Sequence, residues 1–369
     1  MMQTPRMRPG PDARPMPDAD AGVKPDRPRE TARIADFCCP APHARPPCPG
    51  DAPLRQACQP ARAHVMLAAP CKRQTGAPMP DTISLNDETF TLHRWGDPAN
   101  PPLLMLHGFP EYGGAWQEVA TRLPGWQCIA PDQRGYGGSP CPPDVAAYDL
   151  RRLVADMAAL IERIGAPLPV VAHDWGAVVG YGLAMWRPEL LSHLVVINGA
   201  HPGPFQRAAA AGGDQSAALA YIAWLRAEGS EDRLARDDFA KLQQLFAEGM
   251  DMSWLSGETL ARYKAAWQGR ERVRGMVNWY RASPLQVALP GAPVARPHVL
   301  DPQAGHVACP HLVIWGEDDT ALLPDCLQGL DAYCPDLTVH RIPGADHWIC
   351  HQKPDLVAGL IRDWLGARG

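Results

Sequence analysis

The feature that most constrains the fold is a motif with small residues at fixed positions on both sides of one carboxylate, residues 172–177, which read Ala-His-Asp-Trp-Gly-Ala. An apolar run at 168–171 precedes it and is typical of a buried strand, and residues 178–186 favour a helix. A strand that turns at once into a helix has room only for small neighbours, and it holds the residue at the turn exposed on a strained backbone. The sequence therefore predicts a strand–turn–helix with Asp174 at its apex.

Strand and helix patterns alternate along the chain from residue 82 onwards. Further strands are predicted at 90–95, 103–106, 128–130, 194–198, 311–315 and 338–342, with helices at 150–164 and 356–365. The continuous apolar run at 103–106 suits a strand that is buried on both faces. This alternation predicts a mainly parallel sheet flanked by helices.

The strand pattern stops between residues 201 and 294. Helical segments are predicted there at 217–227, 236–248 and 258–266. We interpret residues 201–294 as an all-helical cap inserted between two parts of one α/β core, which comprise residues 79–200 and 295–369. The segment 290–310, rich in proline and glycine, is the expected return linker, and His201-Pro202 is expected to be a hinge rather than a ligand.

The first 78 residues have a different composition from the rest of the chain. They hold 16 of the 41 prolines and almost no periodic apolar pattern. Such a segment cannot bury enough surface to offset the entropy of ordering it, so we expect it to be disordered. It is either a functional tail or the product of an over-extended start, since Met79 precedes the first regular pattern.

Composition excludes several classes of partner. The net charge is −5, and Lys and Arg exceed Asp and Glu within residues 1–78, so the remaining chain is acidic and nucleic acid is an unexpected ligand. The 11 cysteines show neither Cys-x-x-Cys pairs nor metal-ligand spacing, which favours free thiols in a reducing compartment. No run of 18 apolar residues and no secretory signal is present, so we expect no membrane association and a cytoplasmic location.

Asp174 is the candidate nucleophile. A carboxylate can attack a saturated carbon and form an alkyl ester, whereas serine is poorly suited to that reaction. The alternative is that Asp174 only caps the following helix, a common role of aspartate. A second half-reaction needs an activated water, and His347, on the loop after predicted strand 338–342, is the candidate base. His351 is the weaker candidate because it should lie in the closing helix.

A carboxylate is needed to orient the imidazole and stabilise its charged form. Three acids follow predicted strand 311–315; Asp319 is our choice, with Glu317 and Asp318 as alternatives. The backbone N–H groups of Phe109 and Trp175 are predicted to form an oxyanion hole.

Five motifs carry a resemblance to a known family. They are His-Gly-Phe-Pro-Glu at 107–111, Asp-Gln-Arg-Gly-Tyr-Gly-Gly-Ser at 132–139, the run at 172–177, Trp-Gly-Glu-Asp-Asp at 315–319 and Ala-Asp-His-Trp at 345–348. With these motifs, residues 79–369 resemble the α/β-hydrolase superfamily and, within it, the epoxide hydrolases. The order of nucleophile, acid and histidine is the order expected of that fold.

The resemblance implies two cap tyrosines whose hydroxyls donate to the epoxide oxygen. Tyr280 matches the second of these, and Tyr221 is the better match to the first, with Tyr263 as the alternative. A phenol stays protonated at neutral pH and can therefore act as a donor. Tryptophan is frequent in the cap, and we expect some of these residues to line an apolar pocket and most to be core: Trp224, Trp254, Trp267 and Trp279.

The activity that the resemblance implies is hydrolysis of a small apolar epoxide to a vicinal diol, with water as the second substrate. An ester would form on Asp174 and be hydrolysed by water that His347 and Asp319 activate, without a metal or an organic cofactor, in a monomer or homodimer. Haloalkane and haloacid dehalogenases are the related alternative, but Phe109 offers no side-chain donor to a halide and Trp175 stands where fluoroacetate dehalogenases have arginine. A non-catalytic ligand-binding protein is the alternative of another class.

Overall fold

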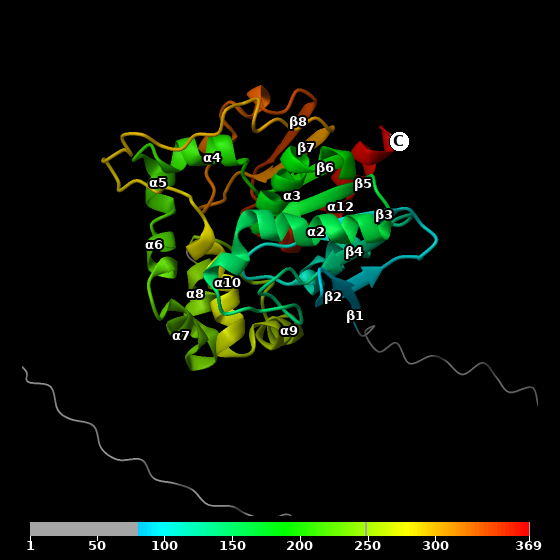
Figure 1. Cartoon of the computed structure of the whole chain (residues 1–369), viewed down its shortest axis with the longest axis horizontal. Coiled ribbons are helices and arrows are strands. Elements are labelled where there is room, and N and C mark those ends of the chain that lie inside the picture. Colours follow the sequence, from blue (N-terminus) through cyan, green and yellow to red (C-terminus); the bar gives the residue numbers. More distant parts are fainter. Residues whose placement is uncertain (1–79, 248, 369) are drawn as a thin grey trace, which may run out of the picture. The chain divides into compact units, whose positions relative to one another are not determined.

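The structure, a computed structural model, describes residues 80–247 and 249–368 (Figure 1), so the predictions for residues 1–78 fall outside the described part of the chain. The described chain contains an eight-stranded sheet of order β1-β2-β4-β3-β5-β6-β7-β8. The first two strands pair antiparallel at one edge, and the other six run parallel to one another. The predicted α/β fold with a mainly parallel sheet is thus confirmed. The strands are β1 (Asp81–Leu85), β2 (Glu88–Trp95), β3 (Pro102–Leu106), β4 (Gln127–Pro131), β5 (Leu168–His173), β6 (Leu191–Ile197), β7 (His311–Gly316) and β8 (Leu337–Ile342).

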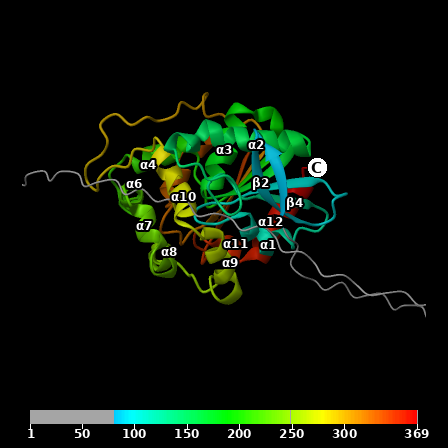
Figure 2. The same ribbon diagram turned by 60° about the horizontal axis from the view of Figure 1, so that its bottom comes forward.

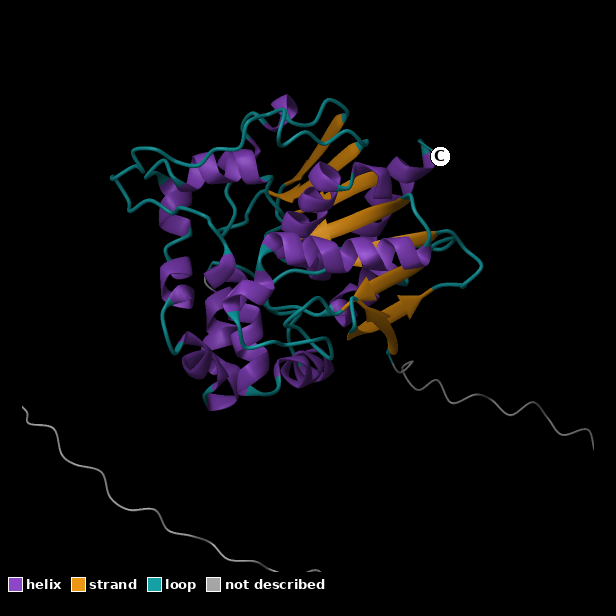
Figure 3. Cartoon of the chain, in the orientation of Figure 1, coloured by secondary structure: helices purple, strands orange, loops and turns teal. Residues whose placement is uncertain are grey.

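Helices cover both faces of the sheet (Figure 3). The parallel strand β3 shows why: Leu104 and Leu106 belong to the core that includes α2 and α3, whereas Leu103 and Met105 belong to the core with α1 and α12. A strand buried on both faces reads as a continuous apolar run, as this one does. The helices outside the cap are α1 (Gln117–Ala120), α2 (Leu150–Ile164), α3 (Trp175–Trp186), α11 (Ile349–Gln352) and α12 (Pro354–Gly366).

Single turns of 3-10 helix complete the described structure. They are Gly113–Trp116, Val145–Tyr148, Pro188–Leu190, Asp237–Phe239, Pro324–Leu327 and Leu330–Ala332.

Seven helices follow one another between β6 and β7, and we refer to residues 201–294 as the cap. They lie together beyond the arrowheads of the central strands, at the edge where the parallel strands end (Figures 1 and 2). The cap helices are α4 (Pro202–Ala209), α5 (Asp214–Ala218), α6 (Tyr221–Arg226), α7 (Ser230–Ala235), α8 (Ala240–Ala247), α9 (Gly257–Trp267) and α10 (Arg270–Ala282).

Two predicted cap helices have wrong boundaries. The segment 217–227 is divided into α5 and α6, because Leu219 leaves the helical path and is itself buried in the core. The segment predicted to begin at residue 236 starts only at Ala240, since Asp237, Asp238 and Phe239 all have positive φ angles of 49–63°. Aspartate tolerates this left-handed region better than most residues, so the aspartate pair accounts for the break.

The prediction that His351 lies in the closing helix is wrong. That residue lies in the short α11, which ends before Pro354 opens α12. A proline disfavours helical backbone in the residue before it, and this separates the two helices.

Within residues 80–247 and 249–368, no helix combines the length and apolarity needed to cross a membrane. The six cysteines in this part of the chain are free thiols.

Candidate active site

Asp174 lies at the turn that joins β5 to α3. Its φ and ψ angles are 49° and −119°, a strained conformation for a residue other than glycine. The turn packs so tightly on β3 that a Cβ atom at Gly176 would lie 2.2 Å from the carbonyl oxygen of Leu106. The small residues of the motif are therefore required by close backbone approach. The capping alternative is wrong, because the Asp174 side chain makes no hydrogen bond to the start of α3.

The Asp174 carboxylate instead faces the loop after β3 and the imidazole of His347. Its Oδ1 accepts a hydrogen bond of 2.7 Å from the backbone N–H of Phe109, and its Oδ2 lies 3.6 Å from His347 Nε2. A Cβ atom at Gly108 would lie 2.4 Å from Oδ1, so only glycine fits beside the carboxylate. Burial opposes ionisation, but the hydrogen bond and charge of His347 hold the pKa of Asp174 below its ordinary value. The carboxylate is therefore charged and ready to act as a nucleophile.

The second predicted oxyanion donor, Trp175, is the first residue of α3. A backbone N–H at that position has no partner within its own helix. Its indole ring packs edge-on against Tyr280, with ring centroids 5.0 Å apart. Of the two predicted donors, Phe109 donates to the carboxylate from the loop after β3, and Trp175 directly follows Asp174 at the start of α3.

His347 lies between two carboxylates. Its Nδ1 lies 2.7 Å from Asp319 Oδ2, opposite the side that faces Asp174. Burial disfavours the imidazolium, but the charge of Asp319 and the hydrogen bond to Asp174 raise the pKa of His347 well above its ordinary value. The two carboxylates therefore favour the protonated form of the ring.

Among the three acids that follow β7, the structure brings only Asp319 to the histidine. Its second oxygen, Oδ1, accepts the backbone N–H groups of Ala321 and Leu322 at 2.8 and 2.9 Å. Glu317 pairs with Arg341 at the surface, and Asp318 is exposed. From the sequence alone, any of these three acids could have been the partner of His347.

Asn198 is a site residue that the sequence argument missed. Its side-chain amide donates to Asp319 Oδ2 at 2.8 Å, and its Oδ1 accepts the Gly316 N–H at 2.8 Å. The residue is fully buried, follows β6 and has a φ of 35°. The only sequence signal was an amide side chain at the end of a predicted strand, which is too common to select it.

A buried network under the site was also missed. Glu111 Oε2 lies 2.8 Å from His173 Nδ1, and its Oε1 lies 2.7 Å from His351 Nε2. His173 Nε2 in turn lies 2.9 Å from the carbonyl oxygen of His347. Burial disfavours the charged carboxylate, but His173 and His351 hold the pKa of Glu111 well below its ordinary value. The network fixes the loop that carries His347, and it places His351 away from Asp174.

The network also decides between the candidate tyrosines. Tyr263 directs its hydroxyl to Glu111 Oε1 at 3.2 Å and to His351 at 3.1 Å, so this alternative is wrong. Tyr221 and Tyr280 share a cavity with Asp174, and their ring centroids lie 6.3 Å apart. Burial raises the pKa of both phenols, and the charge of Asp174 adds to the effect, so both hydroxyls stay protonated.

Arg226 connects the two helices that carry these tyrosines. It extends from α6, five residues after Tyr221, and its Nε donates to the carbonyl oxygen of Tyr280 at 2.9 Å. One further nitrogen donates to the carbonyl oxygens of Ser283 and Leu285 at 3.1 and 3.0 Å. The carbonyl groups at the end of a helix lack partners within it, so the guanidinium satisfies that of Tyr280, binds the segment that follows α10 and ties α10 to α6.

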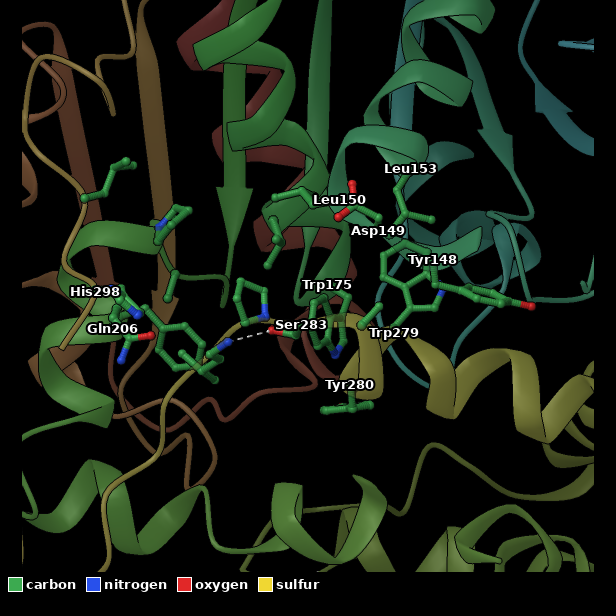
Figure 4. Close-up of a pocket in the computed structure, with 18 of the residues that line it drawn as sticks. Tyr148, Asp149, Leu150, Leu153, Trp175, Gln206, Trp279, Tyr280, Ser283 and His298 are labelled. Carbon is green, nitrogen blue, oxygen red and sulfur yellow. Dashed lines mark hydrogen bonds between the residues drawn. The ribbon is translucent and has the colours of Figure 1, made fainter. Parts of the chain in front are cut away.

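The cavity that reaches Asp174 has a volume of about 590 Å³. Figure 4 shows Trp175, Trp279 and Tyr280 projecting into it between the start of α2 on one side and Ser283, at the end of α10, and His298 on the other. Of the cap tryptophans, Trp279 lines this cavity and donates its indole N–H to the Arg134 carbonyl oxygen at 2.8 Å. His201 has a structural role, since its Nδ1 accepts the Gly203 N–H at the start of α4.

No group of three histidine, cysteine, aspartate or glutamate side chains in residues 80–247 and 249–368 has an arrangement suited to a metal ion. The groups that the described residues bring close to Asp174 are the His347 imidazole and the backbone N–H of Phe109, and the phenols of Tyr221 and Tyr280 share its cavity.

Comparison with known proteins agrees with this arrangement. Residues 101–354 match the α/β-hydrolase fold family. The chain is 31% identical over 287 residues to the AB hydrolase superfamily protein YfhM of Bacillus subtilis, which covers 76% of this chain and 96% of that protein. It is similar, with a TM-score of 0.70 and 30% identity, to an epoxide hydrolase structure from metagenomes of hot environments, over 78% of this chain and 98% of the other. A mutant of an epoxide hydrolase from Bacillus megaterium matches with a TM-score of 0.69 and 27% identity over 78% of this chain and all of that one.

Proposed function

Because the chain belongs to the α/β-hydrolase superfamily, and within it to the epoxide hydrolase family, we propose that it hydrolyses epoxides to vicinal diols through a covalent ester on Asp174. The observation that carries the proposal is that Asp174 shares one cavity with two buried phenols, Tyr221 and Tyr280. A carboxylate and two proton donors around one space suit a substrate that is attacked at carbon while its oxygen gains negative charge.

The two oxygens of Asp174 have different surroundings, and this assigns their roles. Oδ1 is held by the Phe109 N–H, whereas Oδ2 faces the imidazole. Oδ2 therefore attacks one ring carbon, and the carbon–oxygen bond of the epoxide breaks. The released oxygen takes the electron pair and accepts a proton from Tyr221 or Tyr280. Oδ1 becomes the carbonyl oxygen of the ester and already lies in the oxyanion hole.

Formation of the ester changes the state of His347. The negative charge of Asp174 is one cause of the raised pKa of His347, and esterification removes that charge. The pKa of the imidazole therefore falls, and the imidazolium gives its proton to the tyrosine that was deprotonated in ring opening. The neutral ring can then accept a proton from water. Alkylation of the nucleophile thus converts the histidine from a cation into a base.

Water then attacks the ester carbonyl carbon while His347 takes its proton and Asp319 holds the imidazolium. The developing oxyanion lies against the N–H groups of Phe109 and Trp175, and each such donor contributes roughly 3 kcal/mol. Collapse of this intermediate releases the diol and frees Asp174. The hydroxyl proton of the intermediate passes to the departing oxygen, and the imidazolium remains beside Asp174 and Asp319 as at the start, so epoxide and water give diol with no net change in the protein.

The test is to trap the ester in a His347→Gln variant. With styrene oxide as the probe, mass spectrometry of the digested protein should show the peptide that contains Asp174 heavier by one substrate molecule. An Asp174→Ala, His347→Gln double variant is the matched control and should give no adduct. An unmodified Asp174 peptide in a variant that still binds the epoxide would refute the covalent route, and halide release from haloalkanes by the wild type would favour dehalogenation instead.

A further inference from the structure

The segment between α8 and α9, residues 249–256, connects the cap to the loops that carry His347 and Asp319, and we call it the α8–α9 loop. Its first residue, Gly249, packs on Thr320, which directly follows Asp319: a Cβ atom at Gly249 would lie 3.0 Å from Thr320 Cγ2. The cap therefore has two parts that reach the site. The helices α6 and α10 carry the tyrosines, whereas the α8–α9 loop contacts the residues that are proposed to activate water.

The backbone of Asp251 in this loop is held at both of its polar groups. Its N–H donates to Asp346 Oδ2 at 2.7 Å, and its carbonyl oxygen accepts a hydrogen bond of 3.2 Å from Gln352 Nε2. Gln352 Oε1 in turn accepts the N–H of Asp346 at 3.3 Å. Asp346 and Gln352 thus form one clamp around a single residue of the cap. Asp251 itself is exposed, so the clamp is what holds this part of the loop on the core.

Asp346 joins this clamp to His347, which it directly precedes. Its second oxygen, Oδ1, accepts the N–H of Trp348, the residue directly after His347, at 2.8 Å. One carboxylate therefore fixes the chain on both sides of the imidazole and also ties that chain to the cap. Asp346 is only 6% exposed, so water competes little for these bonds. Hydrogen bonds from backbone N–H groups to a carboxylate are stronger than those to a neutral acceptor.

Ring packing gives the α8–α9 loop a second, independent contact with the same stretch of the core. Trp254 stacks on His351 with ring centroids 3.8 Å apart and planes 7° from parallel, and it packs on Trp348 with centroids 5.5 Å apart. None of these ring contacts, and none of the hydrogen bonds of Asp346, involves the groups that would open the ring, which are Asp174, Tyr221 and Tyr280. The loop therefore supports the base without contacting the ring-opening groups through these bonds.

From this arrangement we infer that Asp346 is a positioning residue for hydrolysis of the ester, through which the α8–α9 loop holds His347 in place. The inference rests on the proposed function, because it requires an ester on Asp174 that His347 helps to hydrolyse. A base must lie within about 3 Å of the water that it deprotonates, and a displacement of about 1 Å costs up to about a hundredfold in rate. Loss of the clamp should therefore slow hydrolysis and leave ring opening nearly unchanged.

The first measurement separates the two steps in Asp346→Ala. Styrene oxide is mixed with an excess of enzyme, the reaction is stopped with acid at intervals, and mass spectrometry follows the fraction of the Asp174 peptide that carries the substrate. The rise of this fraction gives the rate of ester formation, and its decay gives the rate of hydrolysis. We expect hydrolysis to slow about ten- to a hundredfold and ester formation to stay within about threefold of the wild type. Asp346→Asn, which keeps one accepting oxygen, should recover part of the loss.

Steady-state kinetics add a result that a merely structural role would not produce. When hydrolysis limits turnover, slowing it lowers kcat and KM by the same factor, so kcat/KM stays close to that of the wild type. Loss of folded enzyme instead lowers kcat at an unchanged KM. In Asp346→Ala we therefore expect kcat and KM to fall together, and a fall in kcat alone would overturn the positioning role.

The second measurement approaches the clamp from the cap with a matched pair of variants. Asp251→Pro lacks the N–H that donates to Asp346, whereas Asp251→Ala keeps it and loses only the hydrogen bond of 2.9 Å from the Ser253 N–H to Asp251 Oδ1. Asp251→Pro should slow hydrolysis at least about fivefold more than Asp251→Ala does. In the Asp251→Pro, Asp346→Ala double variant, hydrolysis should be hardly slower than in Asp346→Ala, because both changes remove the same hydrogen bond. Ester formation shows in each case that the variant is folded.

The outcomes separate the two proposals. Equal slowing of both steps in Asp346→Ala, hydrolysis at the wild-type rate in that variant, or additive effects in the double variant would overturn the positioning role but not the epoxide chemistry. No diol from any epoxide, together with no adduct in His347→Gln, would overturn the proposed function and the inference together.

Discussion

Arg226 gives the sharpest test of how the cap prepares the ring-opening step. Its side chain makes three hydrogen bonds, one to a carbonyl oxygen of α10 and two to carbonyl oxygens of the segment just after it, and it belongs to the helix that carries Tyr221. We expect it to be a positioning residue that sets the separation of Tyr221 from Tyr280. Arg226→Met removes all three hydrogen bonds and keeps an apolar stem of similar length, whereas Arg226→Lys keeps the charge.

The magnitudes follow from these contacts. A hydrogen bond to a charged group contributes about 1.5–3 kcal/mol, but the freed carbonyl groups of a half-buried site partly regain water. We therefore expect Arg226→Met to lower the free energy of unfolding by about 2–3 kcal/mol. A displacement of about 1 Å in a group that acts on the reacting atoms costs up to about a hundredfold in rate. The rate of ester formation should fall about ten- to a hundredfold, and Arg226→Lys should recover part of it.

The assay is a single-turnover measurement that separates ester formation from ester hydrolysis. Stopped-flow tryptophan fluorescence is suitable because Trp175 lies beside Tyr280. In Arg226→Met the rate of ester hydrolysis should change less than threefold, since the hydrogen bonds of Arg226 in the described structure go to neither His347 nor Asp319. A Tyr280→Phe, Arg226→Met double variant should be hardly slower than Tyr280→Phe alone. Equal slowing of both steps, or additive effects in the double variant, would refute the positioning role and leave Arg226 as a general stabilising residue.

Three further predictions concern the core. Asn198→Ala removes a donor to Asp319 and leaves the buried backbone N–H of Gly316 without its acceptor. The free energy of unfolding in urea should therefore fall by about 2–4 kcal/mol, and ester hydrolysis should slow more than ester formation. An unchanged unfolding midpoint would contradict this. Gly108→Ala places a Cβ atom against the Asp174 carboxylate. This change should lower kcat/KM at least about a hundredfold, while the circular dichroism spectrum should stay close to that of the wild type. Near-normal turnover would show that the carboxylate can move. Asp174→Ala removes one of two carboxylates that raise the pKa of His347, so its NMR titration midpoint should move to lower pH. A histidine whose pKa is raised in the folded state stabilises the fold below its unfolded pKa, and this stabilisation is lost as pH rises through the folded pKa. In Asp174→Ala the folded pKa of His347 is lower, so the stabilisation should be lost at a lower pH than in the wild type. Identical titration midpoints in the two proteins would argue against the coupling between Asp174 and His347.

The chain itself determined those features that depend on neighbours a few residues apart. Small residues around Asp174 indicated the turn, because close approach to β3 leaves no space for a Cβ atom at Gly176. Apolar runs indicated strands, because a strand buried on both faces needs them without interruption. Cap helices were predicted less well, since Asp237 and Asp238 adopt left-handed backbone that helical periodicity does not reveal.

Tertiary structure alone decided which side chains meet. Asp319 was one of three consecutive acids until the fold brought it to His347, and Tyr263 was a candidate until packing directed it to Glu111. Asn198 carried no local signal strong enough to select it, because its partner lies 121 residues away in the sequence. Periodicity records which face of an element is buried, but a hydrogen-bond partner depends on the register and tilt of elements that are distant in the chain, and that information exists only once they have packed.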